Sequence, residues 1–224
     1  MIFLVVGTFL VLATVLVVVG LIQAKKRREE LSAYAATRGW TFVARDDSLV
    51  RRFSGAPFGR GHSRRATNVL LGVWDDRPMV AFDYEYAETT GTGDDRSTTT
   101  YRYSVTVLNT GAPMPALSVT PQNIVSGFFG RLTNRDIELE SEEFNRAFLV
   151  TCEHRKFASD VLHPRMMELL LGRPDLGWRF EGDSMITVRR GQHDPAEVDA
   201  TLAHLDAVVD AIPEFVWRDV RGQA

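Results

Sequence analysis

The sequence predicts an α+β protein in which an N-terminal transmembrane helix precedes one domain with a mainly antiparallel sheet and flanking helices. Residues 2–24 contain no ionisable side chain and consist mostly of Val, Leu, Ile and Phe. The rest of the chain shows neighbouring strands with period-two alternation, separated by helical patterns and not by a regular β-α repeat. That order is typical of α+β folds. About 200 residues suit a single domain, which we expect at residues 40–224.

The apolar run predicts a membrane anchor over residues 1–24. About 20 apolar residues in a helix cross the hydrocarbon layer of a bilayer. A cleaved signal peptide would carry its cations before the apolar core, whereas here four consecutive cations follow it at residues 25–28. Because Lys and Arg beside a span stay on the cytoplasmic side, we expect a single-pass cell-membrane protein with its N-terminus outside and its domain in the cytoplasm. The expected partner of residues 2–24 is the lipid bilayer.

Charge is distributed unevenly along the chain. The net charge of −3 combines a basic segment, residues 25–65, with an acidic remainder. A basic segment beside a membrane attracts anionic lipid headgroups, while an acidic domain argues against general nucleic-acid binding. We therefore expect no nucleic-acid partner. The cations predicted to contact anionic lipid are Lys25, Lys26, Arg27, Arg28, Arg60, Arg64 and Arg65.

Residues 25–39 predict a basic juxtamembrane helix. Leu31, Tyr34 and Ala35 share one face at helical spacing, and Gly39 is a suitable stop. The aromatic and branched residues at 40–43 then indicate a first strand.

Two long strands are the clearest feature of the domain. An apolar run at 67–74 leads through a turn into residues 80–86, where Val, Phe and Tyr alternate with smaller or charged residues. Residues 101–107 repeat the alternation after a polar segment at 88–98. Adjacent alternating runs joined by a polar loop predict a long hairpin.

The carboxyl-terminal half predicts short strands and several helices. We expect a strand at 117–120 and a short helix over 121–129, then helices beginning at Phe157 and Pro164. A hairpin is expected near residues 178–190. The most strongly marked helix follows Asp194, because a capping residue, a first-turn proline and a capping-box glutamate occur together there.

Four short motifs occur in a characteristic order. They are the Tyr-Glu-Tyr of residues 84–86, the Tyr-Arg-Tyr of 101–103, residues 144–148 and the Leu-His-Pro-Arg of 162–165. With the N-terminal apolar run, they give a sequence that resembles a group of uncharacterised bacterial single-anchor membrane proteins with a soluble domain of unknown function. The resemblance implies no activity, no cofactor and no catalytic residues.

Candidate chemical groups are few and scattered. Cys152 and His154 would share a strand face, and with His163 they form only a fragment of a metal site, since a tight zinc site takes four ligands. A nucleophilic role for Cys152 beside a histidine base is the other possibility. A lone cysteine in a strand is more often a small buried apolar residue, and it leaves no intrachain disulfide, as expected of a cytoplasmic domain.

Two histidines also lie near carboxylates along the sequence. His193 precedes Asp194, whose role we assign to helix capping, and we expect His204 to be solvated because it lies off the apolar stripe. The acidic run at 138–143 is typical of a solvated face. Neither Gly-x-Ser-x-Gly nor a dinucleotide-binding fingerprint occurs. We expect no catalytic residue, metal or cofactor.

These features favour a membrane-anchored protein whose cytoplasmic domain binds a protein partner or the membrane surface without catalysis. Two alternatives stay open. One is a membrane-tethered, hydrolase-like enzyme whose site is assembled from dispersed residues, and the other is a sensor domain that holds a small molecule between sheet and helices. An enzyme would show a pocket with convergent polar groups.

Overall fold

The structure is a computed structural model that describes residues 2–123 and 137–222. The side chains of residues 2–13, 16, 17 and 94 are not described. The helix predicted at 121–129 lies mostly outside the described residues.

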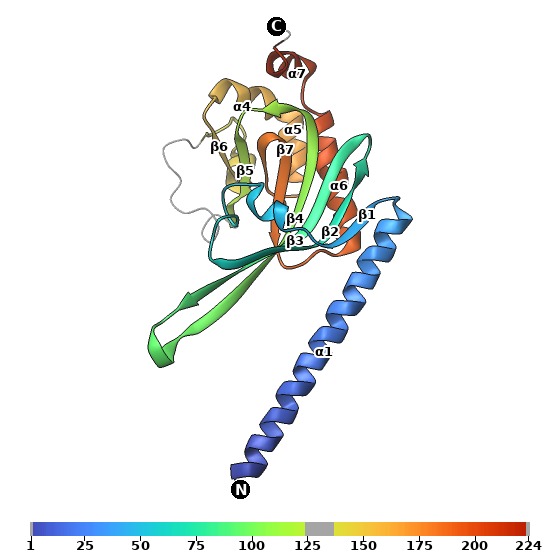
Figure 1. Ribbon diagram of the computed structural model, residues 1–224. Coiled ribbons are helices and arrows are strands. Elements are labelled where there is room, and N and C mark those ends of the chain that lie inside the picture. The colour runs from blue at the N-terminus through green and yellow to red at the C-terminus, as the bar shows by residue number, and fades with distance from the viewer. Residues whose placement is uncertain (1, 124–136, 223–224) are drawn as a thin grey trace.

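Helix α1 (Ile2–Thr37) is a single rod that leaves the body of the protein (Figure 1). The predicted transmembrane anchor is wrong, because no helix within the described residues is both long and apolar enough to cross a membrane. The predictions of a single-pass location and of its orientation depended on the anchor and are therefore also wrong.

One antiparallel sheet of seven strands forms the centre of the body, which confirms the α+β part of the fold-class prediction. Its order is β1-β2-β3-β4-β7-β5-β6, so the late strand β7 lies between β4 and β5. The strands are β1 (Thr41–Arg45), β2 (His62–Trp74), β3 (Arg77–Thr90), β4 (Ser97–Met114), β5 (Leu117–Pro121), β6 (Phe148–Cys152) and β7 (Trp178–Arg190).

Helices cover one face of this sheet. The C-terminal part of α1 packs there through Leu31 and Ala35, in the same apolar cluster as residues from the five helices described between residues 142 and 220. These helices are α3 (Glu142–Ala147), α4 (Arg155–Val161), α5 (Pro164–Leu171), α6 (Pro195–Asp210) and α7 (Glu214–Val220). Helix α6 starts as predicted, since the Asp194 carboxylate accepts a hydrogen bond from the Ala196 N–H at 2.9 Å and Pro195 occupies the first turn.

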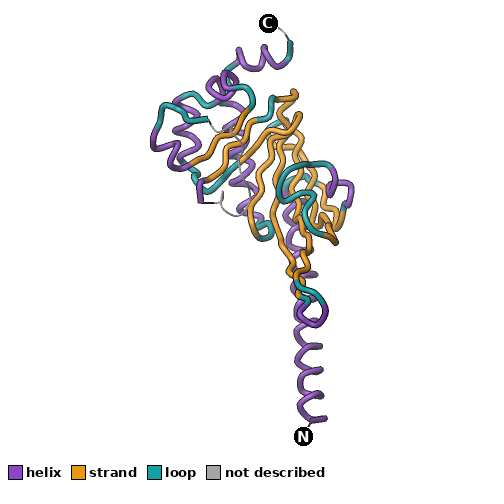
Figure 2. Tube along the Cα trace, turned by 90° about the vertical axis from the view of Figure 1, so that its left-hand side faces the viewer, coloured by secondary structure: helices purple, strands orange, loops and turns teal. Residues whose placement is uncertain are grey.

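The opposite face of the sheet is covered by the loop of residues 46–61, which includes the 3-10 turn η1 (Asp47–Arg51) (Figure 2). Phe53 stacks on Phe82 with ring centroids 6.2 Å apart, and Phe58 contacts Tyr84 at 4.9 Å. Both faces of the central strands are therefore buried, which is unusual for an antiparallel sheet. A polar side chain in the middle of β3 is therefore buried by protein whichever face of the sheet it points to.

Strands β3 and β4 continue beyond their neighbours as a two-stranded arm (Figure 1). Pairing extends to Thr90 and Ser97, so the strands are longer and the polar tip is shorter than predicted. The tip holds the 3-10 turn η2 (Gly93–Asp95), with Gly91 at φ of 81°. In both views α1 and the arm leave the same end of the body (Figure 2).

Gly72 tests the packing of β2 against Trp40, a residue in the connection between α1 and β1. A Cβ atom built at Gly72 would lie 2.1 Å from Cδ1 of Trp40, whose ring covers this position. Gly72→Ala should therefore lower the free energy of unfolding by about 1–3 kcal/mol through overpacking, as measured by urea denaturation. Gly20→Ala is the control, since its Cβ meets nothing within 4 Å. Equal stability of Gly72→Ala and wild type would contradict this packing.

Candidate functional site

Asp83 is a buried carboxylate on the helix-covered face of the sheet, with 4% of the residue exposed. Its Oδ1 accepts the backbone N–H of His193 at 2.8 Å and lies 3.1 Å from His193 Nδ1. Its Oδ2 accepts Asn68 Nδ2 at 2.8 Å and Arg27 Nη2 at 3.3 Å. Donors from β2, from α1 and from the loop before α6 thus converge on one residue, as a buried charge requires.

The local chain explains why each donor reaches this point. Asn68 lies at an irregularity of β2 with φ of 51°, a conformation that asparagine tolerates better than most residues. His193 directly precedes Asp194, the N-cap of α6, so the start of that helix sets its position. Arg27 also donates to the His193 carbonyl oxygen. The same contacts therefore hold α1 and α6 together on the sheet.

Hydrogen bonding decides the charge state of Asp83. Burial favours the neutral acid, but the hydrogen bonds from His193 and Asn68 outweigh it and hold the pKa of this carboxyl below its usual range. Asp83 is therefore ionised near neutral pH, and the Arg27 guanidinium lies within ion-pair distance of it.

A polar cleft of about 320 Å³ opens beside this buried group. One wall consists of β4 and β7, with Ser104 opposite Arg189 in the strand register. The other wall consists of the loop at His193 and the first turns of α6, including Glu197 and Thr201. Hydroxyl, guanidinium, imidazole and carboxylate groups all line it, so the cleft can exchange hydrogen bonds with a polar ligand.

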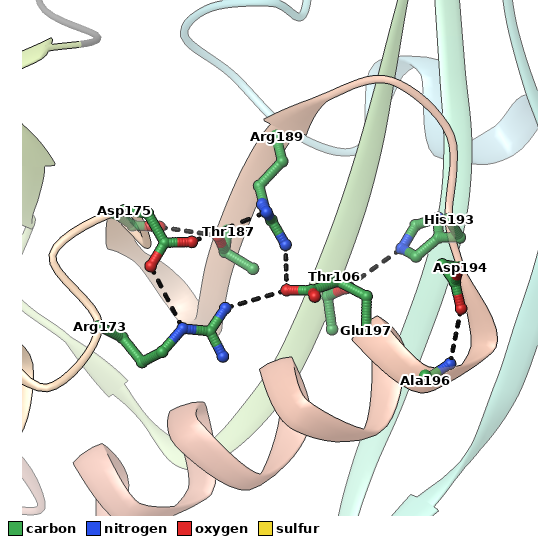
Figure 3. A network of polar contacts seen from close by, with 10 residues as sticks. Thr106, Arg173, Asp175, Thr187, Arg189, His193, Asp194, Ala196 and Glu197 are labelled. Carbon is green, nitrogen blue, oxygen red and sulfur yellow. Dashed lines mark hydrogen bonds and ion pairs between the residues drawn. The ribbon is translucent and has the colours of Figure 1, made fainter.

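His193 connects the cleft to the buried carboxylate. Its Nδ1 faces Asp83, and its Nε2 lies 3.2 Å from Thr106 Oγ1 (Figure 3). If Nδ1–H donates to Asp83, Nε2 accepts the Thr106 hydroxyl, an assignment made from the network. This connectivity is that of a nucleophile–base–acid triad, with threonine in the nucleophile position.

Four charged side chains form a closed ring at the end of the cleft (Figure 3). Glu197 accepts from Arg189 and, at 2.9 Å, from Arg173. Asp175 lies 3.2 Å from Arg173 and 3.7 Å from Arg189. Burial works against ionisation of Asp175, but the hydrogen bond from Arg173 keeps its pKa below the usual range. The ring ties the loop before β7 to α6.

His204 is buried near this ring, so the prediction that it is solvated is wrong. Only 8% of the residue is exposed, and its Nε2 has no hydrogen-bond partner in the described part of the chain. Burial, followed by the charge of Arg173, lowers the pKa of His204. The neutral imidazole packs as a core side chain on α6.

The other predicted candidates occupy structural positions. Cys152 is buried, donates to the His154 carbonyl oxygen at 3.3 Å and has a pKa raised by burial. His163 caps α5 through Nδ1, while Nε2 lies 3.0 Å from the Ala211 carbonyl oxygen. These side chains have separate partners and do not converge as ligands.

One acidic cluster among the described residues has the spacing of metal ligands. Carboxylate oxygens of Asp75, Asp206 and Asp210 lie within 4.8 Å of one another. Arg77 already supplies a cation there, since it pairs with Asp206 and, at 2.6 Å, with Asp210. The cluster is an arginine-bridged contact between β3 and α6.

The cations predicted to contact lipid are distributed over α1 and the start of β2. Lys25 and Lys26 are exposed and pair with glutamates one turn later in α1. Arg27 instead faces Asp83, and Arg65 pairs with Glu85. Arg64 donates to the carbonyl oxygens of Arg60 and Gly61. The lipid contact stays a prediction for these residues.

Sequence reasoning missed Asp83, Asn68 and Thr106, which build the site. The alternation of β3 placed Asp83 on the face opposite Phe82, where a charged residue usually meets solvent. The one available signal was a charged residue in the middle of a long strand, close to aromatic neighbours. That signal does not reveal which segments supply the donors.

The chain matches no family model and no curated protein. Among solved structures, it is similar to the mycobacterial trehalose monomycolate transport factor A, with a TM-score of 0.60 and 14% sequence identity. The likeness covers 83% of this chain and 96% of that one. At this level of identity it shows a shared fold.

Asp83→Asn tests the buried carboxylate. Removing the charge leaves Arg27 and His193 without their anion, so the free energy of unfolding at pH 7 should fall by about 3 kcal/mol. Because the pKa of Asp83 is lower in the folded state, its contribution is present above the unfolded value of about 3.9 and is lost as pH falls through the folded pKa.

The measurement is urea unfolding between pH 7 and pH 2. Asp83→Asn should flatten the acid limb of the stability profile, whereas the control Glu168→Gln, at an exposed position of α5, should leave that limb close to wild type. If the acid limb of Asp83→Asn matched that of the wild type, the buried carboxylate would not contribute to stability as described.

Vesicle co-sedimentation tests the lipid prediction. Replacing Lys25, Lys26 and Arg28 with Gln should reduce binding to vesicles that contain anionic lipid, since clustered cations near a surface attract it. Replacing the arginines of residues 60–65 tests the second group. Equal binding of the wild type to neutral and anionic vesicles would refute the contact.

Proposed function

We propose that this protein is a non-catalytic accessory factor in lipid transport, which binds an acylated sugar or a transport partner without chemical change. The observation that carries the proposal is the fold likeness, which extends over 96% of a transport factor for trehalose monomycolate. Fold alone does not determine function. The proposal therefore also depends on what the site is built to do.

The groups that usually perform acid–base chemistry are engaged in structural contacts. The Asp83 carboxylate is occupied by donors from α1, β2 and the loop before α6. Cys152 is buried, and its raised pKa disfavours the thiolate. A rigid polar cleft that lies beside such groups suits recognition of a polar headgroup.

Hydrolysis is the second candidate function, because Thr106, His193 and Asp83 have the connectivity of a triad. In this alternative the Thr106 hydroxyl is the nucleophile and His193 is the base. Thr106 is only 3% exposed, and this burial limits the approach of an acyl group to its hydroxyl.

An in vivo lipid analysis tests the transport proposal. Depletion of the protein in its source organism should shift acylated sugars from the outer envelope to the inner fraction, as quantified by mass spectrometry of separated fractions. Expression of the wild-type chain should restore the distribution. An unaltered distribution after depletion overturns the transport proposal.

The purified full-length chain, assayed with p-nitrophenyl esters, separates the two candidates. Wild type and Thr106→Val should hydrolyse the ester at the same background rate. A wild-type rate at least 100-fold above Thr106→Val, retained in Thr106→Ser, would establish hydrolysis and remove the non-catalytic proposal; loss of a nucleophile typically costs more than this.

A further inference from the structure

We propose that the polar cleft is a binding site for an uncharged polyhydroxylated group, either a free sugar or the sugar headgroup of a glycolipid. This inference gives a ligand class to the cleft, and it rests on the proposed function only for the biological source of that ligand. Four features of the cleft support it: hydroxyl groups on both walls, balanced charge, size and side chains that are already held in place.

Hydroxyl groups line both walls of the cleft. Thr201 lies on α6 and Ser104, which is half-buried, lies on β4. Neither hydroxyl is among the buried side-chain atoms that lack a hydrogen-bond partner in residues 2–123 and 137–222. Each hydroxyl can donate one hydrogen bond and accept others, and sugar hydroxyls are complementary because they also do both.

The charges around the cleft balance. Arg189 and Arg190 contribute two cations, and Asp194 and Glu197 contribute two carboxylates. A phosphate or carboxylate ligand would approach both acids as well as both arginines, so the cleft gives little net attraction to an anion. The Gln192 side chain adds an uncharged amide donor and acceptor. This composition fits a neutral ligand with many polar groups.

Size agrees with a small ligand. The cleft volume of about 320 Å³ lies at the lower end of the range for small-molecule sites, roughly 300–1,000 Å³. A sugar of one or two rings is the expected scale. A long acyl chain would have to extend outside the cleft.

The walls are held before a ligand arrives. Glu197 and Arg189 are locked by the ion-pair ring with Arg173 (Figure 3). The Thr106 hydroxyl and the His193 ring are fixed through Asp83. Such support reduces the ordering that binding requires.

Titration of the full-length chain with trehalose, maltose and a monoacyl trehalose ester tests the site. Inorganic phosphate is the charged comparison. Saturation-transfer NMR should detect both disaccharides, and calorimetry should give dissociation constants for the wild type and three variants. The variants are Thr201→Val, Thr201→Ser and Ser118→Ala, the last removing a half-buried hydroxyl from β5 outside the cleft.

Thr201→Val should weaken sugar binding about three- to tenfold, the usual effect of losing one uncharged hydrogen bond. Thr201→Ser and Ser118→Ala should bind like wild type. Equal affinity for sugar and ester identifies a free sugar as the ligand, and a tighter ester identifies a glycolipid headgroup; both results support the site. Binding of phosphate without sugar, no sugar binding, or an unchanged constant in Thr201→Val overturns it.

Thermal unfolding of each variant is measured alongside, so that a folding defect in Thr201→Val is recognised. If that variant unfolds, Ser104→Ala takes its place with the same expected weakening. The two proposals can be refuted independently. If the protein binds no sugar but its depletion alters the lipid distribution, only the sugar-site proposal is refuted. If the protein binds sugar but its depletion leaves the lipid distribution unaltered, only the transport proposal is refuted.

Discussion

The Asp83 carboxylate is the interaction on which the arrangement of the elements depends. It lies at the centre of β3, where the sheet is covered on both faces, and only 4% of the residue is exposed. Asn68, Arg27 and His193 therefore have to be in place together. Each of these residues belongs to a different element. Because the buried charge of Asp83 needs all of these hydrogen-bond partners, it fixes the positions of α1, the bulge of β2 and the start of α6.

The helix-covered face of the sheet changes character along the strands. Met79, Leu108 and Met185 are neighbours across β3, β4 and β7 and are buried under helices. Four residues further along β3, Asp83 has Ser104 and then Arg189 as cross-strand neighbours. Helix α6 starts over this boundary. The packed face of α6 covers the apolar cross-strand neighbours, and its first turns leave a cleft over the polar ones. The packing of the helix and the presence of the cleft therefore both follow from this change from apolar to polar residues along the strands.

Local patterns predicted the elements that depend on neighbours in sequence. The β3–β4 hairpin follows from alternation in residues 80–86 and 101–107, and α6 follows from its capping signals. Period and capping act within a few residues, so they are readable from the chain. The apolar composition of residues 2–24 predicts a membrane anchor, and this prediction is wrong, since no helix within the described residues is long and apolar enough to cross a membrane.

The sequence by itself determined the antiparallel α+β character of the protein, its hairpin and its capped helix, because these depend on short-range periodicity. Only the tertiary structure decided that β7 inserts between β4 and β5. The same holds for the burial of Asp83 and His204 and for the polar cleft beside His193. Those features join residues more than 100 positions apart, such as Asp83 and His193. No local pattern encodes such a distance, because the contact forms only when separate elements pack.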